Sequence, residues 1–142
     1  MALSRPFVIL SVGSSLEVES LKTRGLVLRR QGYVVASVDN IETTLALFSQ
    51  PDFRFDLLIL SHTIPYAERN RVAELCKEAN PSSRILVLVP HIDCDPLADG
   101  CIDPQEGPQA LLDLIASLLK KAAQREGRQG PGRAGGAKSK PA

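Results

Sequence analysis

The hydrophobic positions of this 142-residue chain fall into short strand-length runs that alternate with longer stretches of helical periodicity. The clearest run is residues 57–60, four consecutive aliphatic side chains that follow Asp56 and precede Ser61. Such a run indicates a strand that is buried on both faces of a parallel sheet. Pro65 cannot take part in the ladder of hydrogen bonds, so the chain is expected to leave the sheet there.

Five predicted strands alternate with four predicted helices. The strands are residues 7–12, 33–38, 57–60 and 85–89, with a short fifth strand at 101–102. The helices run from about residue 15 to 31, from 41 to 49, from 66 to 80, and from 108 to the start of the basic tail. This alternation predicts an α/β fold, a doubly wound five-stranded parallel sheet with the flavodoxin-like strand order 2-1-3-4-5.

The interval between the fourth and fifth strands is short and polar. Pro90, Pro96 and Gly100 interrupt it, so at most one helical turn fits between residues 90 and 102. A doubly wound sheet places a helix at this point of the chain. We therefore expect helix four to be shortened or absent.

The composition divides the chain into one domain, residues 1–125, and a tail, residues 126–142. From residue 127 onward the sequence is rich in Gly, Pro, Ala, Lys and Arg and has no Leu, Ile, Val or aromatic residue, which predicts disorder. Residues 120–142 hold seven of the 17 basic side chains and one of the 16 acidic ones. Residues 1–119 therefore carry a net charge of about −5 and residues 120–142 a net charge of about +6.

Two features predict a cytoplasmic protein without a membrane partner. No apolar run approaches the length of a membrane-spanning helix, and the amino-terminal apolar run is too short for a signal peptide. The three cysteines, Cys76, Cys94 and Cys101, are odd in number and show no framework spacing, so we expect reduced thiols.

The chain from residue 7 to about 122 resembles the response-regulator receiver domains of the CheY-like superfamily. The resemblance rests on the order and spacing of the elements and on Ile64-Pro65, which matches the Met-Pro that follows the third strand in that family. It implies the flavodoxin-like fold already expected from the hydrophobic pattern. It also places the family's phosphoacceptor Asp on Ser61.

The other reactive positions of the family are changed as well. The resemblance places the acidic pair that binds Mg²⁺ on Gly13 and Ser14, the switch Thr or Ser on Val89, and the Lys that precedes a Pro on Asp103. Phosphoryl transfer to a carboxylate needs a divalent cation, and hard Mg²⁺ prefers carboxylate ligands. The chain is therefore expected to be a degenerate pseudo-receiver with no metal or other cofactor and no enzymatic activity.

The function implied by this resemblance is a phosphorylation-independent protein-interaction module in signal transduction, related to two-component or phosphorelay pathways. Its partner would be a signalling protein. It would bind through helix one, residues 15–31, or through helix five, the helix that starts at residue 108. Two alternatives stay open. The Gly13-Ser14-Ser15 turn could bind an anion or a nucleotide on its backbone N–H groups, although a helix cap also accounts for it. The basic tail could contact nucleic acid weakly, although no aromatic side chains are interleaved for base stacking.

Two further constellations have simpler explanations. Ser61 and His62 could act as nucleophile and base, but no third orienting group and no Gly-x-Ser-x-Gly motif accompany them. Two polar residues at the end of a strand, without a catalytic role, would account for Ser61 and His62 equally well. The loop from residue 91 to 103 gathers possible metal ligands, namely His91, Cys94 and Cys101 with Asp93, Asp95, Asp99 and Asp103. Their spacing matches no strong metal motif, and a solvated acidic loop is the alternative.

Overall fold

The structure, a computed structural model, describes residues 5–128. Five parallel strands form one sheet in the order β2-β1-β3-β4-β5. The strands are β1 (Val8–Val12), β2 (Val34–Val38), β3 (Leu57–Ser61), β4 (Arg84–Leu88) and β5 (Gly100–Cys101). The helices are α1 (Val18–Arg30), α2 (Ile41–Phe48), α3 (Tyr66–Ala79) and α4 (Pro108–Arg128). The predicted flavodoxin-like strand order is confirmed.

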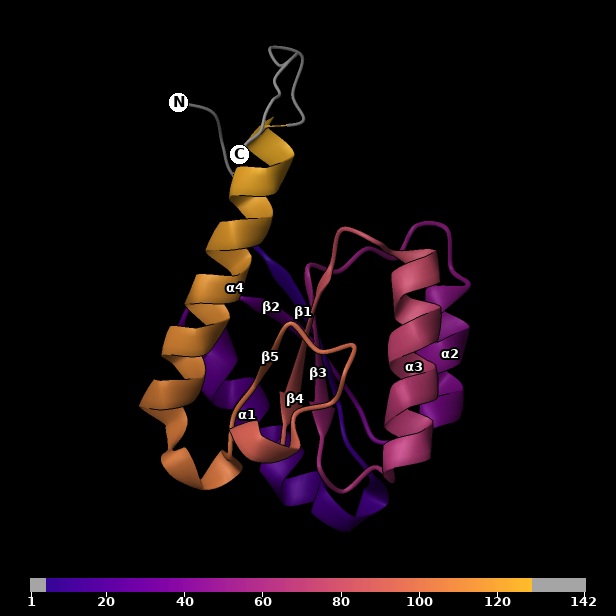
Figure 1. Cartoon of the computed structure of the whole chain (residues 1–142), viewed down its shortest axis with the longest axis vertical. Helices are drawn as coiled ribbons and strands as arrows, with labels where there is room; N and C mark the ends of the chain where they lie inside the picture. The colour runs from indigo at the N-terminus through magenta and orange to yellow at the C-terminus, as the bar shows by residue number, and fades with distance from the viewer. Residues whose placement is uncertain (1–4, 129–142) are drawn as a thin grey trace.

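The helices form two layers, one on each face of the sheet. Figure 1 shows α2 and α3 together on one side of the sheet and α1 and α4 on the other. The carboxyl ends of the strands, the turns that follow them and the start of α4 lie together at the lower end of that view. Residues that follow different strands therefore meet at this end, which is where doubly wound sheets place their functional groups.

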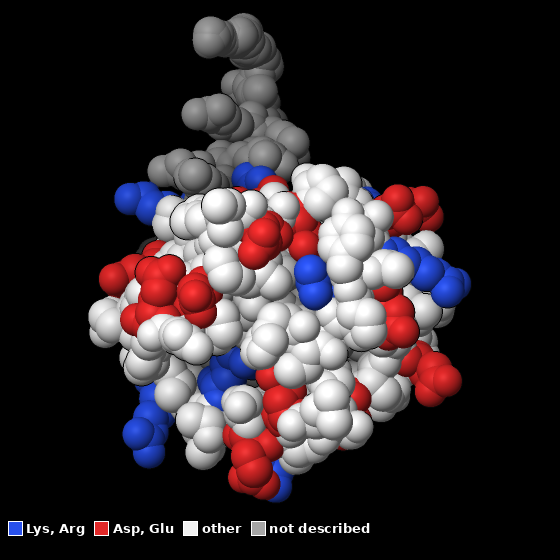
Figure 2. All heavy atoms as spheres, turned by 60° about the horizontal axis from the view of Figure 1, so that its bottom comes forward, with Lys and Arg blue, Asp and Glu red and all other residues white. Residues whose placement is uncertain are grey.

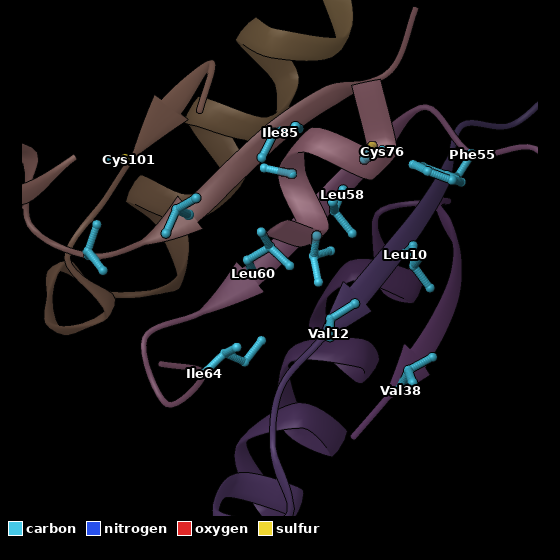
Figure 3. Packing of buried hydrophobic residues seen from close by; sticks show 14 residues of the cluster. Leu10, Val12, Val38, Phe55, Leu58, Leu60, Ile64, Cys76, Ile85 and Cys101 are labelled. Carbon is cyan, nitrogen blue, oxygen red and sulfur yellow. The ribbon is translucent and has the colours of Figure 1, made fainter. Parts of the chain in front are cut away.

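The core explains why the third strand is apolar throughout. All five residues of β3 are buried. Leu58 and Leu60 belong to the cluster that α3 helps to cover (Figure 3), whereas Leu57 and Ile59 belong to the cluster under α1 and α4. Because successive side chains of a strand point to opposite faces, a strand covered on both faces needs an unbroken hydrophobic run.

The first helix begins later than the pattern predicts. Residues 15–17 form a short 3₁₀ turn, η1 (Ser15–Glu17), and α1 starts at Val18. Ser14 caps this turn, because its hydroxyl accepts a hydrogen bond from the N–H of Leu16. At the other end the chain leaves α1 through Gly32, whose φ of 93° favours a residue without a Cβ.

The expected shortening of helix four is confirmed. Between β4 and β5 the only helical element is a single 3₁₀ turn, η2 (His91–Asp93). The fourth α-helix along the chain, α4, follows β5 and a further turn, η3 (Pro104–Glu106). The strand β5 contains two residues, so the edge strand on this side of the sheet is short.

Helix α4 extends to Arg128, three residues past the domain boundary expected at residue 125. The rest of the predicted tail, residues 129–142, lies outside the described residues. Within residues 5–128, no helix combines the length and the apolar character that crossing a bilayer requires.

The expectation of three reduced thiols is wrong for two of them. Cys94 and Cys101 form a disulfide with a Cα–Cα distance of 5.5 Å, whereas Cys76 is a buried free thiol. The spacing of seven residues gave no sign of this bond, because it depends on the path of the loop. With helix four missing, the loop turns back at once and places Cys94 beside β5, where Cys101 lies.

Candidate functional site

The position where the resemblance places the phosphoacceptor, Ser61, belongs to a network of hydroxyl groups. Ser61 ends β3, and its side chain is completely buried. Its Oγ lies 3.1 Å from Oγ1 of Thr63 and accepts a hydrogen bond of 3.1 Å from the Thr63 N–H. The Oγ of Ser14, which follows β1, donates to Oγ1 of Thr63 at 2.9 Å. Three neutral side chains thus satisfy one another at this point.

The sequence placed Ser14 and Ser61 at this end of the sheet, but it did not indicate Thr63. Thr63 lies in the turn that leaves β3, and it is the group that joins the two serines. A threonine in a turn has no distinguishing pattern, so sequence reasoning could not have selected it.

Gly13 lies close to the side chains of Glu17 and Leu21 at the same turn. Its N–H donates to the carbonyl of Val38 at 2.9 Å, and a Cβ at this position would collide with the carboxylate of Glu17. That carboxylate is almost fully buried and lies 3.4 Å from the guanidinium of Arg24. Burial lowers the pKa of Arg24, and the charge of Glu17 opposes this effect. An acidic residue cannot replace Gly13 unless this pair moves.

The two remaining positions have structural roles. Val89 is buried and packs in the hydrophobic cluster of β1, β3 and β4. Asp103 caps the turn η3, because its Oδ1 accepts a hydrogen bond of 2.9 Å from the N–H of Gln105. The five positions are thus spread over one end of the sheet, but only Ser14 and Ser61 belong to the same hydrogen-bonded network.

The catalytic and anion-binding alternatives find little support in this geometry. The hydrogen-bond partner of the Ser61 hydroxyl is Thr63, and His62 is exposed. A nucleophile and its base would have to be joined by a hydrogen bond. At the turn after β1 the N–H of Gly13 is already engaged, and the buried carboxylate of Glu17 would repel an anion.

Five of the seven possible metal ligands of the loop 91–103 are engaged in other interactions, among them Asp103, which caps η3. Cys94 and Cys101 are bonded to each other, and Asp95 is paired with Arg69. Asp99 accepts a hydrogen bond of 2.8 Å from the N–H of Ile85. Within the described part of the chain, no three His, Cys, Asp or Glu side chains converge on one point. The structure therefore does not assemble these residues into a metal centre.

A buried ion pair holds the loop that replaces helix four. The guanidinium of Arg69 donates to both carboxylate oxygens of Asp95, at 2.8 and 2.9 Å, and to the carbonyl of Ile64 at 2.8 Å. Both side chains are buried, and the hydrogen bonds to Asp95 raise the pKa of Arg69. The pair joins α3, the turn after β3 and the loop before β5, and its 26-residue separation leaves no pattern in the sequence.

A groove lies between α1 and the start of α4. Its volume is about 440 Å³, and its apolar lining includes Val27, Leu88, Ile102, Pro104 and Leu111. Figure 2 looks toward this end of the molecule, where uncharged side chains predominate and both acidic and basic groups lie among and around them. The groove thus offers apolar contact area close to charged groups.

Comparison with known proteins gives structural matches only. No family model matches the chain, and no curated protein matches it. A CheY-like response regulator receiver domain protein from Methanospirillum hungatei is 19% identical, with a TM-score of 0.71 over 85% of this chain and 99% of that one. The signal receiver domain of an HD domain-containing protein from Pseudomonas fluorescens is 16% identical, with a TM-score of 0.75 over 90% and 97%.

A third match is the response regulator TrrA from Thermotoga maritima in complex with Mg²⁺ and BeF, at 23% identity and a TM-score of 0.65. It covers 79% of this chain and 98% of TrrA. All three structures match over most of this chain, at identities that are informative about the fold alone. The chain therefore has the CheY-like fold of response-regulator receiver domains, with a loop that holds only the turn η2 between β4 and β5.

Proposed function

We propose that this chain is a pseudo-receiver that binds a signalling protein without being phosphorylated. The observation that carries the proposal is the hydroxyl network of Ser14, Thr63 and Ser61 at the place where a receiver holds its phosphoacceptor. Neutral hydroxyls do not bind Mg²⁺ as carboxylates do, and without the cation the charge on a transferring phosphoryl group is not neutralised. A receiver can still bind a partner protein when this phosphoryl chemistry is lost.

The groove between α1 and α4 is the surface that we propose for the partner. It is formed by the two helices for which the sequence suggested partner binding, and its lining is largely apolar. In one solved structure a histidine kinase, ThkA, is in complex with the response regulator TrrA, which shares this fold. By analogy with that complex, the partner would be a signalling protein such as a histidine kinase.

The first test addresses phosphoryl chemistry. Solution NMR of the full chain with Mg²⁺ and beryllofluoride, a phosphoryl mimic, is expected to give no saturable shifts at Ser61 or in residues 85–103. Incubation with acetyl phosphate and Mg²⁺ is expected to leave the mass of the protein unchanged. An acid-labile phosphoadduct in residues 57–65, or saturable shifts that spread from Ser61, would show that a working receiver survives and would refute the proposal.

The second test addresses the groove, and neighbouring residues of α1 provide a matched pair. Val27 lines the groove, whereas Leu26 is exposed and lines a different surface near β2. Val27→Glu is expected to weaken binding of the partner at least about tenfold, because it places a charge in an apolar contact. Leu26→Glu, the control, is expected to leave the affinity unchanged.

The measurement is the dissociation constant of the partner once it has been identified by cross-linking to the full chain. It is determined with and without acetyl phosphate and Mg²⁺, and circular dichroism checks that both variants fold. Equal affinities for the two variants would place the partner elsewhere on the surface. An affinity that changes with acetyl phosphate would contradict binding that is independent of phosphorylation.

A further inference from the structure

The loop that replaces helix four is attached to the body at three points. The Asp95 carboxylate is paired with Arg69 on α3, as described above. The Asp99 carboxylate accepts the N–H of Ile85, and the Asp99 N–H donates to the Ile85 carbonyl at 2.7 Å. The third attachment is the disulfide between Cys94 and Cys101. Two of the three are thus independent of the disulfide.

The turn η2, residues 91–93, depends on the disulfide more than the rest of the loop does. Two hydrogen bonds hold it, from Asp93 N–H to the Pro90 carbonyl and from Cys94 N–H to the His91 carbonyl, and both are local. Ile92 in the middle of the turn is 90% exposed, so packing adds little. The covalent bond of Cys94 to β5 is what fixes the turn to the edge of the sheet.

The two cysteine residues differ in their exposure. Cys94 is exposed, whereas Cys101 lies in β5 with 1% of its surface exposed and packs in the hydrophobic cluster. Exchange of a disulfide requires a thiolate to approach one sulfur, and access decides which sulfur is attacked. Only the Cys94 side of this bond is open to a molecule from solvent.

We propose that the Cys94–Cys101 bond is a thiol-exchange site at which small external thiols act on Cys94. An external thiolate forms a bond to Sγ of Cys94, and Cys101 leaves as a thiolate that takes a proton from solvent. A second external thiolate attacks the external sulfur of this mixed disulfide and releases Cys94, which is protonated in turn. Two external thiols are oxidised to one disulfide, and the protein bond gains two electrons and two protons.

The consequence of this exchange is local. After reduction the Arg69–Asp95 pair and the Asp99 contacts still hold the loop from residue 95 onward. The turn η2 with Ile92 is released, while the sheet and its helices keep their packing. The oxidation state of the bond therefore decides whether an exposed apolar side chain at the carboxyl end of the sheet is fixed or mobile.

Cys76 provides an internal reference. It is completely buried, its Sγ lies 3.3 Å from Oγ of Ser83, and burial raises the pKa of its thiol. Because the thiolate is the reactive form, Cys76 is expected to stay unmodified in the folded protein. Modification of Cys76 in a given sample then reports unfolding and not exchange.

The test uses the full chain in its oxidised form, incubated with millimolar reduced glutathione and then with an alkylating reagent. Peptide mass spectrometry is expected to find the exposed Cys94 alkylated, and the buried Cys101 and Cys76 unmodified. NMR of the reduced protein is expected to show shifts confined to residues 90–102. A bond that resists glutathione until denaturant is added, or shifts throughout the sheet, would overturn the proposal.

Two single variants test which sulfur is attacked. In Cys101→Ser the exposed Cys94 is expected to form a mixed disulfide with oxidised glutathione. In Cys94→Ser only the buried Cys101 remains, and its reaction is expected to be at least about tenfold slower. Equal rates, or faster reaction of Cys101, would contradict attack at Cys94. Circular dichroism and unmodified Cys76 establish that each variant is folded.

Discussion

Replacing Asp95 with alanine is expected to lower the free energy of unfolding by about 3–5 kcal/mol. The variant leaves the guanidinium of Arg69 in place, although Arg69 is only 8% exposed and two of its three hydrogen bonds go to Asp95. A buried cation without its partner retains the full cost of its desolvation. The measurement is urea unfolding of the oxidised protein, in which the disulfide still holds the loop.

The surface of α1 provides the control for this prediction. Glu19 and Lys22 form an ion pair with an N–O distance of 3.8 Å, and both side chains are largely exposed. Glu19→Ala is therefore expected to change stability by less than about 0.5 kcal/mol. If Asp95→Ala cost no more than Glu19→Ala, the Arg69–Asp95 pair would not be the attachment that holds the loop to α3.

The fold could be predicted because its signals are local. The run from Leu57 to Leu60 is apolar at every position, and a strand buried on both faces requires this. Pro65 marks the end of that strand, and Asn40 caps α2 by accepting the N–H of Thr43 at 2.7 Å. Each of these signals spans a few residues, so one sequence without relatives contains enough information to place the element.

The attachments of the loop could not be predicted, because they join distant parts of the chain. Arg69 and Asp95 are 26 residues apart, and each resembles an ordinary surface residue in the sequence. Cys94 and Cys101 are close in sequence, but the count of three cysteines pointed to free thiols. The shortened helix was foreseen, whereas the side chains that compensate for the missing helix became visible only when the path of the loop was known.

The candidate site was predicted in part. Ser14 and Ser61 do meet at the carboxyl end of the sheet, as the order of the strands implies. The role of Thr63 as the link between them depends on the rotamers of a turn, which have no sequence signature. The limited space for a side chain at Gly13 could not be predicted either, because it arises from the buried position of Glu17.

Ser61→Asp, which places a carboxylate at the phosphoacceptor position, is expected to destabilise the protein and not to restore phosphorylation. The new carboxylate would be buried beside the hydroxyls of Thr63 and Ser14. Gly13 and Ser14, where the resemblance places the acidic pair that binds Mg²⁺, have no carboxylate to accompany it. The expected loss at pH 7 is about 3 kcal/mol, the order of magnitude for a buried charge without a partner.

The pH dependence distinguishes the charge from the size of the new side chain. Burial favours the neutral carboxyl, so the folded variant binds a proton at a higher pH than the unfolded chain does. The loss of stability is therefore largest near neutral pH and becomes smaller as the pH falls toward 5, because protonation removes the charge. Ser61→Asn, of nearly the same shape but without charge, is expected to show a smaller loss that does not change over this range.

Thermal unfolding of the three proteins between pH 5 and 7.5 measures these differences, and acetyl phosphate with Mg²⁺ tests the chemistry. If the melting temperatures of Ser61→Asp and Ser61→Asn changed with pH in the same way, the site would accept a carboxylate ion without a loss of stability. Phosphorylation of Ser61→Asp would mean that the cation is held by groups other than Gly13 and Ser14. Either result would favour a receiver that lost its activity through one substitution, whereas the hydroxyl network of Ser14, Thr63 and Ser61 offers the cation no carboxylate.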